Sequence, residues 1–389
     1  MRILWAVSSV GKGHVIRDMV IVNQLQSTAD VEVDWLAPDP AGNFLRERGY
    51  NVLACSSQLS GSGKVYHQVF KDCTDEFNLI EYIRKDTKLH QNDFEISARA
   101  WSGKTYDLIV GDEAFWLLTG FSSNLSKKPA PFVFLTDFLG VKAMQPRIGD
   151  MITAWFNNLK YTMSHLGPDV YIYIGNLEGI PNERFGFLLP NRRSWAKTHC
   201  QFVKPIVSFD PDALPNKKTL RKELGLPVDK RIFIAVVGPE GDHEYRRDQI
   251  EDVFECLKVD FPHAHFILVG PEAGTKTWIH HHRYLENLYQ YFAASDFALI
   301  QSGYGKTIEL SALGVPFIAI PLDYHFEQEY LMAHRLKNDG LGKLITLRNH
   351  SPEEIAKEAK ESLKQQGGSI PVDDGTEIAS IILETHRNP

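Results

Sequence analysis

A glycine turn between a predicted strand and a predicted helix is the first feature of the sequence that could do chemistry. Residues 301–321 read QSGYGKTIELSALGVPFIAIP and follow an apolar run at 297–300 that predicts a buried strand. Gly303 and Gly305 would let the backbone approach a ligand, and the next helix would present unpaired N–H groups and the positive end of its dipole. The arrangement suits a diphosphate, although many such turns only connect a strand to a helix.

His14 is the second candidate, and it suits proton transfer. It follows the apolar run 3–7 in the stretch SSVGKGHVIR. Gly11 and Gly13 fit the start of the dinucleotide fingerprint, but Ile16 stands at its third glycine position, which disfavours a nicotinamide or flavin site. A histidine at the carboxyl end of a strand lies where open α/β sheets bind ligands, and its ordinary pKa of about 6.5 suits a base. We predict His14 as the general base; the alternative is a structural hydrogen bond.

Two aspartates follow later predicted strands and could orient this histidine. Asp112 ends the stretch YDLIVGD, and Asp137 follows the run FVFLT. A catalytic histidine is commonly held by a carboxylate. Asp112 is the first candidate, with a helix N-cap as its structural alternative, and Asp137 is a second candidate orienter or base, held in reserve.

The elements that must position these residues alternate along the chain. Continuous apolar runs predict strands buried on both faces of parallel sheets, at 3–7, 31–36, 108–110, 132–135, 170–174, 232–237, 266–269, 297–300 and 317–320. Helical stretches lie between many of them, at 16–26, 247–257, 307–313 and 327–336. Further helices are expected at 352–365 and 376–385. The fold class is therefore α/β.

The length of 389 residues predicts two domains, because single cores stop growing near about 250–300 residues. The stretch 207–216, VSFDPDALPN, has no periodicity and reads as a linker. We place an N-terminal domain at 1–206, a linker at 207–218 and a C-terminal domain at 219–389, whose last helices either stay with it or pack back on the N-terminal domain.

Composition limits the class of partner. A net charge of −7 disfavours nucleic acid. The four cysteines lack metal or disulfide spacing, and no apolar run approaches the roughly 20 residues that span a bilayer. The stretch 182–195 mixes basic and apolar residues, as a peripheral membrane contact would. We expect a cytoplasmic protein, peripheral at most to the inner face of the membrane, with no essential metal.

The string from Gln301 onward resembles the donor-binding signature of GT-B glycosyltransferases of families 1 and 28, the UDP-glycosyltransferases and the peptidoglycan N-acetylglucosaminyltransferase. Gly303, Thr307 and Glu309 fall on its glycine, threonine and glutamate, and in these families that glutamate binds the ribose hydroxyls. Gln328 and Glu329 fall on the pair that contacts the donor sugar. Plant members carry histidine where Gln301 stands and glutamine where Glu329 stands.

The resemblance implies two Rossmann-like, doubly wound domains facing across a cleft, the first binding an acceptor and the second a nucleotide-sugar donor. His14 falls on the family's histidine, and plant relatives pair it with an aspartate at the position of Asp112. The predicted donor contacts are Gly13, Gly238, Leu285, Gln301, Ser302, Gly303, Tyr304, Gly305, Lys306, Thr307, Glu309, Gln328 and Glu329.

The expected activity is an inverting, metal-independent transfer of a sugar from a nucleotide diphosphate, a UDP-sugar by preference, to an acceptor hydroxyl of a lipid, a glycan or a small molecule. No cofactor is expected beyond the nucleotide-sugar co-substrate. The alternatives are a nonhydrolysing UDP-sugar epimerase on the same fold and a non-catalytic sugar-nucleotide-binding subunit. The sequence gives no oligomeric state.

Overall fold

The computed structural model describes residues 1–8, 12–61, 65, 77–238, 243–270, 274–339, 342–364 and 369–387. It divides the chain into two compact units. The first contains residues 1–69, 78–208 and 372–389, and the second contains residues 70–77 and 209–371. The chain passes from one unit to the other at 208/209, within the stretch 207–218. Residues 372–389 lie with the first unit, so the last helix of the expected domain 219–389 belongs to the first unit.

The first unit is built on a six-stranded sheet of order β2-β1-β3-β4-β5-β6, in which all pairs are parallel. Its strands are β1 (Arg2–Val7), β2 (Glu32–Leu36), β3 (Leu108–Asp112), β4 (Phe132–Thr136), β5 (Val170–Ile174) and β6 (Gln201–Val203). Its helices are α1 (Gly13–Thr28), α2 (Ala41–Arg46), α4 (Leu79–Trp101), α5 (Phe115–Ser123), α6 (Ile148–Met163), α7 (Arg192–His199) and α14 (Thr376–Arg387), with short turns η1 (Ala54–Gln58), η2 (Leu125–Lys127) and η3 (Ser164–Leu166).

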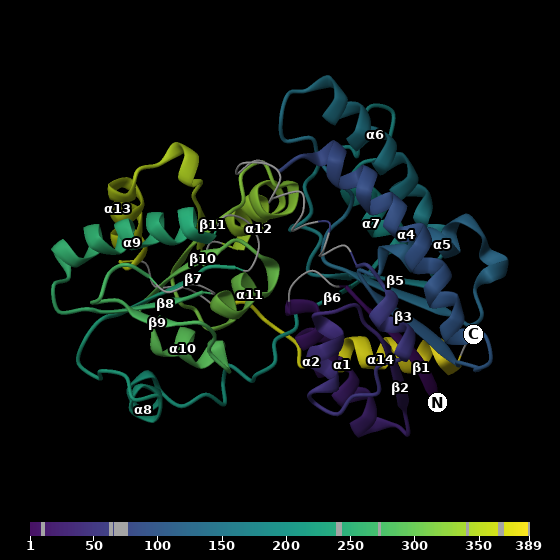
Figure 1. The fold of residues 1–389 in the computed structure, drawn as a ribbon, viewed down its shortest axis with the longest axis horizontal. Helices are drawn as coiled ribbons and strands as arrows, with labels where there is room; N and C mark the ends of the chain where they lie inside the picture. Colours follow the sequence, from purple (N-terminus) through teal and green to yellow (C-terminus); the bar gives the residue numbers. More distant parts are fainter. Residues whose placement is uncertain are drawn as a thin grey trace. The chain divides into compact units, whose positions relative to one another are not determined.

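The second unit has a parallel sheet of order β12-β11-β10-β7-β8-β9. Its strands are β7 (Ile232–Val236), β8 (His265–Val269), β9 (His280–His282), β10 (Phe297–Gln301), β11 (Phe317–Ile320) and β12 (Gly342–Leu344). Its helices are α8 (Lys217–Glu223), α9 (His243–Asp260), α10 (Leu288–Ala294), α11 (Tyr304–Ala312), α12 (Met332–Asp339) and α13 (Pro352–Ser362), with η4 (Phe326–Leu331) and η5 (Leu347–Asn349). Figure 1 shows α9 and α13 on one side of this sheet and α8 and α10 on the other.

Helices cover both faces of the second sheet, which explains its continuous apolar strands. One core cluster joins the sheet to α9 and α13, for example through Phe254 and Ile355. The opposite cluster joins it to α10, α11 and α12, for example through Phe292, Leu310 and Met332. The α/β class and the doubly wound sheets predicted from the sequence are confirmed.

In each sheet the strand order reverses once near the centre. The first sheet runs outward from β1 on one side and from β3 on the other, and the second does the same from β7 and β10. Connections on the two sides of such a switch point leave a crevice at the carboxyl ends of the strands, where open α/β sheets bind ligands. His14 and Asp112 follow β1 and end β3, and Gly238 and Gln301 follow β7 and end β10.

Candidate functional site

A buried polar cluster occupies the switch point of the first sheet. It consists of His14 and Arg17 on the first turns of α1, Asp112 at the end of β3, Glu113 directly after it, and Asp137 directly after β4. The structure therefore brings together all three predicted catalytic residues of the first unit, and it adds Arg17 and Glu113 to them. We call these five residues the buried polar cluster.

Arg17 is the cation of the cluster. Its guanidinium donates to both oxygens of Asp112, with nitrogen–oxygen distances of 2.6, 2.8 and 3.0 Å, and its Nη1 donates to Asp137 Oδ2 at 3.1 Å. Burial opposes ionisation of Asp112, yet the charges of Arg17 and His14 hold the pKa of Asp112 well below its usual range. Asp112 and Asp137 thus lie on the same guanidinium, and Asp112 is shared between Arg17 and His14.

His14 lies between two carboxylates. Its Nδ1 is 3.4 Å from Asp112 Oδ1 and its Nε2 is 3.5 Å from Glu113 Oε2. Burial disfavours the imidazolium, but the negative charges of Glu113 and Asp112 outweigh burial and raise the pKa of His14 to about 9. Burial and the negative charges of Asp137 and Asp112 raise the pKa of Glu113 to about 8. Such shifts in a group of contacting residues are typical of functional sites.

Glu113 also has an unusual backbone. Its φ is +47°, a left-handed conformation that non-glycine residues adopt rarely and often at functional sites. Its Oε1 accepts a hydrogen bond from the backbone N–H of Asp137 at 3.2 Å and lies 3.2 Å from the hydroxyl of Thr136. The carboxylate is therefore aimed by β3 and β4 together, with Oε2 left to face His14.

His14, Asp112 and Glu113 could in principle hold a metal ion, because one ligand atom from each lies within 4.8 Å of the others. The guanidinium of Arg17 already lies 2.6 Å from Asp112 and 2.9 Å from His14 Nδ1. The guanidinium would repel a divalent cation placed between these groups and would compete with the cation for Asp112. We therefore do not assign the three residues as metal ligands.

The switch point of the second sheet carries the predicted glycine turn. Gly303 forms the N-cap of α11 in an extended conformation. A Cβ added at Gly303 or Gly305 would meet no atom within 4 Å, and the same holds for Gly13 at the start of α1. The start of α11 is therefore bare, and its N–H groups can receive an anion.

Gly238, by contrast, is required by its neighbour. A Cβ at this position would lie 2.1 Å from the side-chain oxygen of Gln301, which is 5% exposed. Any larger residue at 238 would displace Gln301. Gly238 and Gln301, both predicted as donor contacts, are thus adjacent, and the glycine serves the placement of the glutamine.

Other side chains of the predicted donor set make contacts within the second unit. Ser302 donates to the carbonyl of Gln328 at 2.8 Å, and Thr307 donates to the carbonyl of Gly303 at 2.7 Å. The ring of Tyr304 lies 4.6 Å from the guanidinium carbon of Arg335. Leu285 packs against the core beside α10. These residues shape the turn and the helix, and the bare backbone supplies the open surface.

Glu309, on the second turn of α11, has no hydrogen-bond or ion-pair partner among the residues that the structure describes. The side chain is half-buried, and this burial raises the pKa of Glu309 to about 7, opposed by the positive charge of Lys306 one turn earlier. A carboxylate withdrawn from water without a partner is costly. The Glu309 carboxylate is therefore available to accept hydrogen bonds from a ligand of the second unit.

Gln328 and Glu329 are both engaged with the chain itself. Gln328 Oε1 accepts from the backbone N–H of Leu322 at 3.1 Å. Glu329 receives two hydrogen bonds from Arg348, at 2.5 and 2.9 Å, and one from the backbone N–H of Tyr324 at 2.7 Å. Arg348 therefore fixes Glu329, and it was not found from the sequence, because no local pattern links positions 329 and 348.

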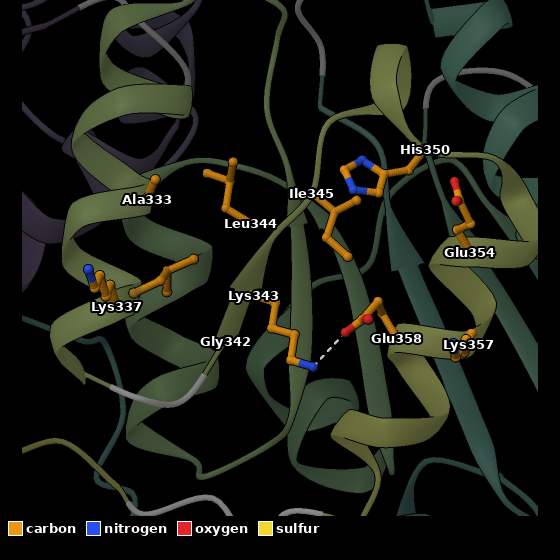
Figure 2. A pocket seen from close by; sticks show the side chains of 11 residues that line it. Ala333, Lys337, Gly342, Lys343, Leu344, Ile345, His350, Glu354, Lys357 and Glu358 are labelled. Carbon is orange, nitrogen blue, oxygen red and sulfur yellow. Dashed lines mark hydrogen bonds and ion pairs between the residues drawn. The ribbon is translucent and has the colours of Figure 1, made fainter.

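A cavity of about 500 Å³ opens at the edge strand β12, between α12 and α13. Figure 2 shows Ala333 and Lys337 on one wall and Glu354, Lys357 and Glu358 on the other, with Lys343 paired to Glu358 at 2.6 Å. No predicted donor residue lines it. This cavity is separate from the glycine turn.

Arg17 and Glu113 were also missed from the sequence, although signals for both were present. Arg17 lies one helical turn after His14, a spacing that places both side chains on one helix face. Glu113 directly follows Asp112 at the strand end. Glu113 was not proposed beside Asp112 and Asp137, because the turn that aims it inward could not be read from the sequence.

Among the described residues, no helix combines the length and apolar character needed to cross a membrane.

Comparisons with known proteins find glycosyltransferases. Residues 253–373 match the family model of the glycosyltransferase family 28 C-terminal domain. An uncharacterized glycosyltransferase of Methanopyrus kandleri is 26% identical over 184 residues, which cover 46% of this chain and 51% of the relative. A UDP-N-acetylglucosamine–N-acetylmuramyl-(pentapeptide) pyrophosphoryl-undecaprenol N-acetylglucosamine transferase of Bifidobacterium longum is 29% identical over 111 residues, 28% of each chain. The matches thus span about half or less of these relatives.

Solved structures match over nearly the whole chain. The calicheamicin glycosyltransferase CalG4 has a TM-score of 0.58 at 14% identity, covering 100% of this chain and 98% of that one. MurG of Acinetobacter baumannii has a TM-score of 0.57 at 12% identity, covering 98% and 99%. At such identities the likeness shows the fold. The chain therefore has the GT-B fold, and its residues 253–373 match the model of the glycosyltransferase family 28 C-terminal domain.

Proposed function

We propose that this protein is an inverting, metal-independent glycosyltransferase that moves a sugar from a nucleotide diphosphate, a UDP-sugar by preference, to an acceptor hydroxyl. The observation that carries the proposal is Glu309, a half-buried carboxylate without a described partner, one helical turn beyond the bare start of α11. A carboxylate can accept both hydroxyl hydrogens of a ribose. The surrounding segment belongs to the matched family 28 domain.

The start of α11 would carry the diphosphate. The N–H groups of the first turn of α11, with the positive end of the helix dipole, would stabilise the charge that develops as the diphosphate leaves. These groups take the place that a metal ion fills in other transferases. The buried polar cluster of the first unit would remove the acceptor proton, and a single displacement at the anomeric carbon inverts its configuration.

Calorimetry with UDP-, TDP- and GDP-sugars, followed by product analysis with hydroxyl acceptors in the presence and absence of EDTA, tests this function. We expect one UDP-sugar to bind, and transfer to continue in EDTA. Binding by none of the donors would contradict the proposal. Incubation with UDP-N-acetylglucosamine alone separates it from an epimerase, which would convert the sugar without an acceptor.

We also propose that the protein binds its acceptor substrate at the surface of a membrane, on the inner face of that membrane. Seven apolar side chains on α6 and in the loop 186–188 are more than half exposed, Met163 among them; we call the other six the α6 strip: Ile148, Met151, Ile152, Phe156, Phe187 and Leu188. Trp155 ties the loop to α6 by donating to the carbonyl of Phe187 at 2.8 Å. Arg147 at the N-cap of α6 and Lys160 on its last turn are both exposed. Apolar residues with basic flanks suit the interface of an anionic bilayer.

Replacing Phe187 by Asp is expected to weaken binding to phosphatidylglycerol vesicles about tenfold, since burying one such side chain contributes about 1.5–3 kcal/mol. Co-sedimentation with the vesicles measures it. Val259→Asp is the matched control, because Val259 is 81% exposed on α9 in the second unit. Equal losses in the two variants would contradict a membrane role for the α6 strip.

A further inference from the structure

The hydrogen bonds of Arg17 limit what His14 can do. A guanidinium carries only donors, and Arg17 Nη2 lies 2.9 Å from His14 Nδ1. When the ring is neutral, Nδ1 accepts from this donor and the ring proton sits on Nε2. When the ring is charged, which the raised pKa of His14 favours, both nitrogens hold a proton and Nδ1 faces Asp112 Oδ1. In both states Nε2 holds a proton.

The Nε2 proton points to a carboxylate. Glu113 Oε2 lies 3.5 Å from Nε2, a distance that commonly tightens when a substrate binds. Asp112 cannot play the same part, because both of its oxygens receive hydrogen bonds from Arg17. On these contacts we propose that Glu113 is the general base of the transfer and that His14 is a positioning residue, held by Arg17, that directs Oε2. The inference rests on the proposed transferase function.

The environment of Glu113 fits this role. Its Oε1 is held by the backbone N–H of Asp137, and the side chain keeps 7% of its surface exposed. The charged groups around it are Arg17 and His14 from α1, Asp112 from the end of β3, and Asp137 after β4. Burial and the two aspartates make it a stronger base than an ordinary carboxylate, which brings its pKa to about 8, near the working pH of a base.

The step balances without a further reactant. The acceptor O–H bond breaks and its proton goes to Glu113 Oε2. The oxygen electron pair forms the new bond to the anomeric carbon, the bond from that carbon to the diphosphate oxygen breaks, and the diphosphate leaves with that electron pair. Glu113 then returns the proton to solvent.

Two variants separate the roles of Glu113 and His14. Glu113→Gln keeps an oxygen for the N–H of Asp137 but cannot accept a proton, so we expect transfer to fall by about 10²–10⁴-fold. His14→Gln keeps both a donor and an acceptor, so we expect it to stay within about tenfold of the parent. Initial rates with the donor that binds, over pH 6 to about 10, give both the loss and the pH profile.

A defect in folding alone would lower the rate without shifting its pH dependence, so the pH profile tests the role of Glu113. The parent rate should rise with pH to a plateau above about 8, as Glu113 ionises. In His14→Gln this rise should move to higher pH, because the positive charge of His14 favours the carboxylate.

Loss of activity in His14→Gln equal to that in Glu113→Gln, or an unchanged profile in Glu113→Gln, would overturn the assignment. Absence of transfer by the parent with every donor would instead refute the transferase function. Unchanged melting temperature and donor affinity in Glu113→Gln separate a lost base from a lost fold.

Discussion

Glu309→Gln should make the free protein more stable above pH 7 and at the same time weaken donor binding about tenfold to a hundredfold. The loss of affinity follows from the ribose hydroxyls, since a hydrogen bond to a charged group contributes about 1.5–3 kcal/mol. The gain in stability follows from burial, which raises the pKa of Glu309 from 4.5 to about 7 in the folded chain. Calorimetry and thermal unfolding measure the two effects.

The pH dependence fixes the sign of the stability effect. Because the folded pKa of Glu309 is raised, folding is favoured most below pH 4.5 and loses stability as the pH rises through about 7. A glutamine does not ionise, so the variant gains about 1–2 kcal/mol over the parent above pH 7, after allowance for partial exposure. Donor affinity of the parent should fall below pH 7, and that of the variant should not.

Gly303→Ala is the matched control for Glu309→Gln. The added Cβ meets no atom within 4 Å and the backbone is extended, so the free fold should keep its melting temperature. The methyl group would fill the space expected for the diphosphate and weaken donor binding. A Glu309→Gln variant that is destabilised, or that binds the donor as tightly as the parent, would contradict the donor site.

Arg17→Met should lower the free energy of unfolding by about 3–5 kcal/mol, the usual cost of leaving buried charges without their partner. The guanidinium is 7% exposed and pairs with Asp112 and Asp137, which are also buried. Burial and the charge of Asp112 raise the pKa of Asp18, which is fully buried beside Asp112, well above the usual range. Without Arg17, the burial of Asp112 would favour its protonation too.

Denaturant unfolding at pH 5 and pH 8 measures the cost of Arg17→Met. The loss should be smaller at pH 5, where protonation relieves the unpaired carboxylates, and Asp112→Asn should recover part of it in the double variant. The control is Arg84→Met on α4, because Arg84 is exposed and pairs with Glu81 on the same helix, so the melting temperature should not change. Equal effects of the two substitutions would mean that the buried polar cluster contributes no stability.

The fold could be predicted from the sequence because long apolar strands and glycine turns are local signals. All nine predicted strands are present, within one or two residues of their expected bounds. The strands that were missed, β6, β9 and β12, have three residues each and lie at the edges of the sheets. β9 is made of His280 to His282, whose composition does not favour a strand.

From the sequence, only those site residues could be predicted that follow or end a predicted strand or lie by a glycine turn. His14, Asp112 and Glu309 follow strands or glycine turns, so their positions could be inferred. The pairing of Glu329 with Arg348, and the fact that Arg17 lies between Asp112 and His14, depend on side chains brought together by tertiary packing. The spacing of residues along the chain does not show which of several nearby carboxylates a guanidinium will pair with.

The packing of α14 on α1 has a consequence for synthesis of the chain. Ile378 and Ile382 are fully buried, and the backbone at Gly375 comes so close to Ile21 that an added Cβ would lie 3.0 Å from its Cα. The partner surface of the first helix therefore leaves the ribosome only after the entire second unit. Until then α1 presents an uncovered apolar face, so the nascent chain can complete its later unit before its earlier one.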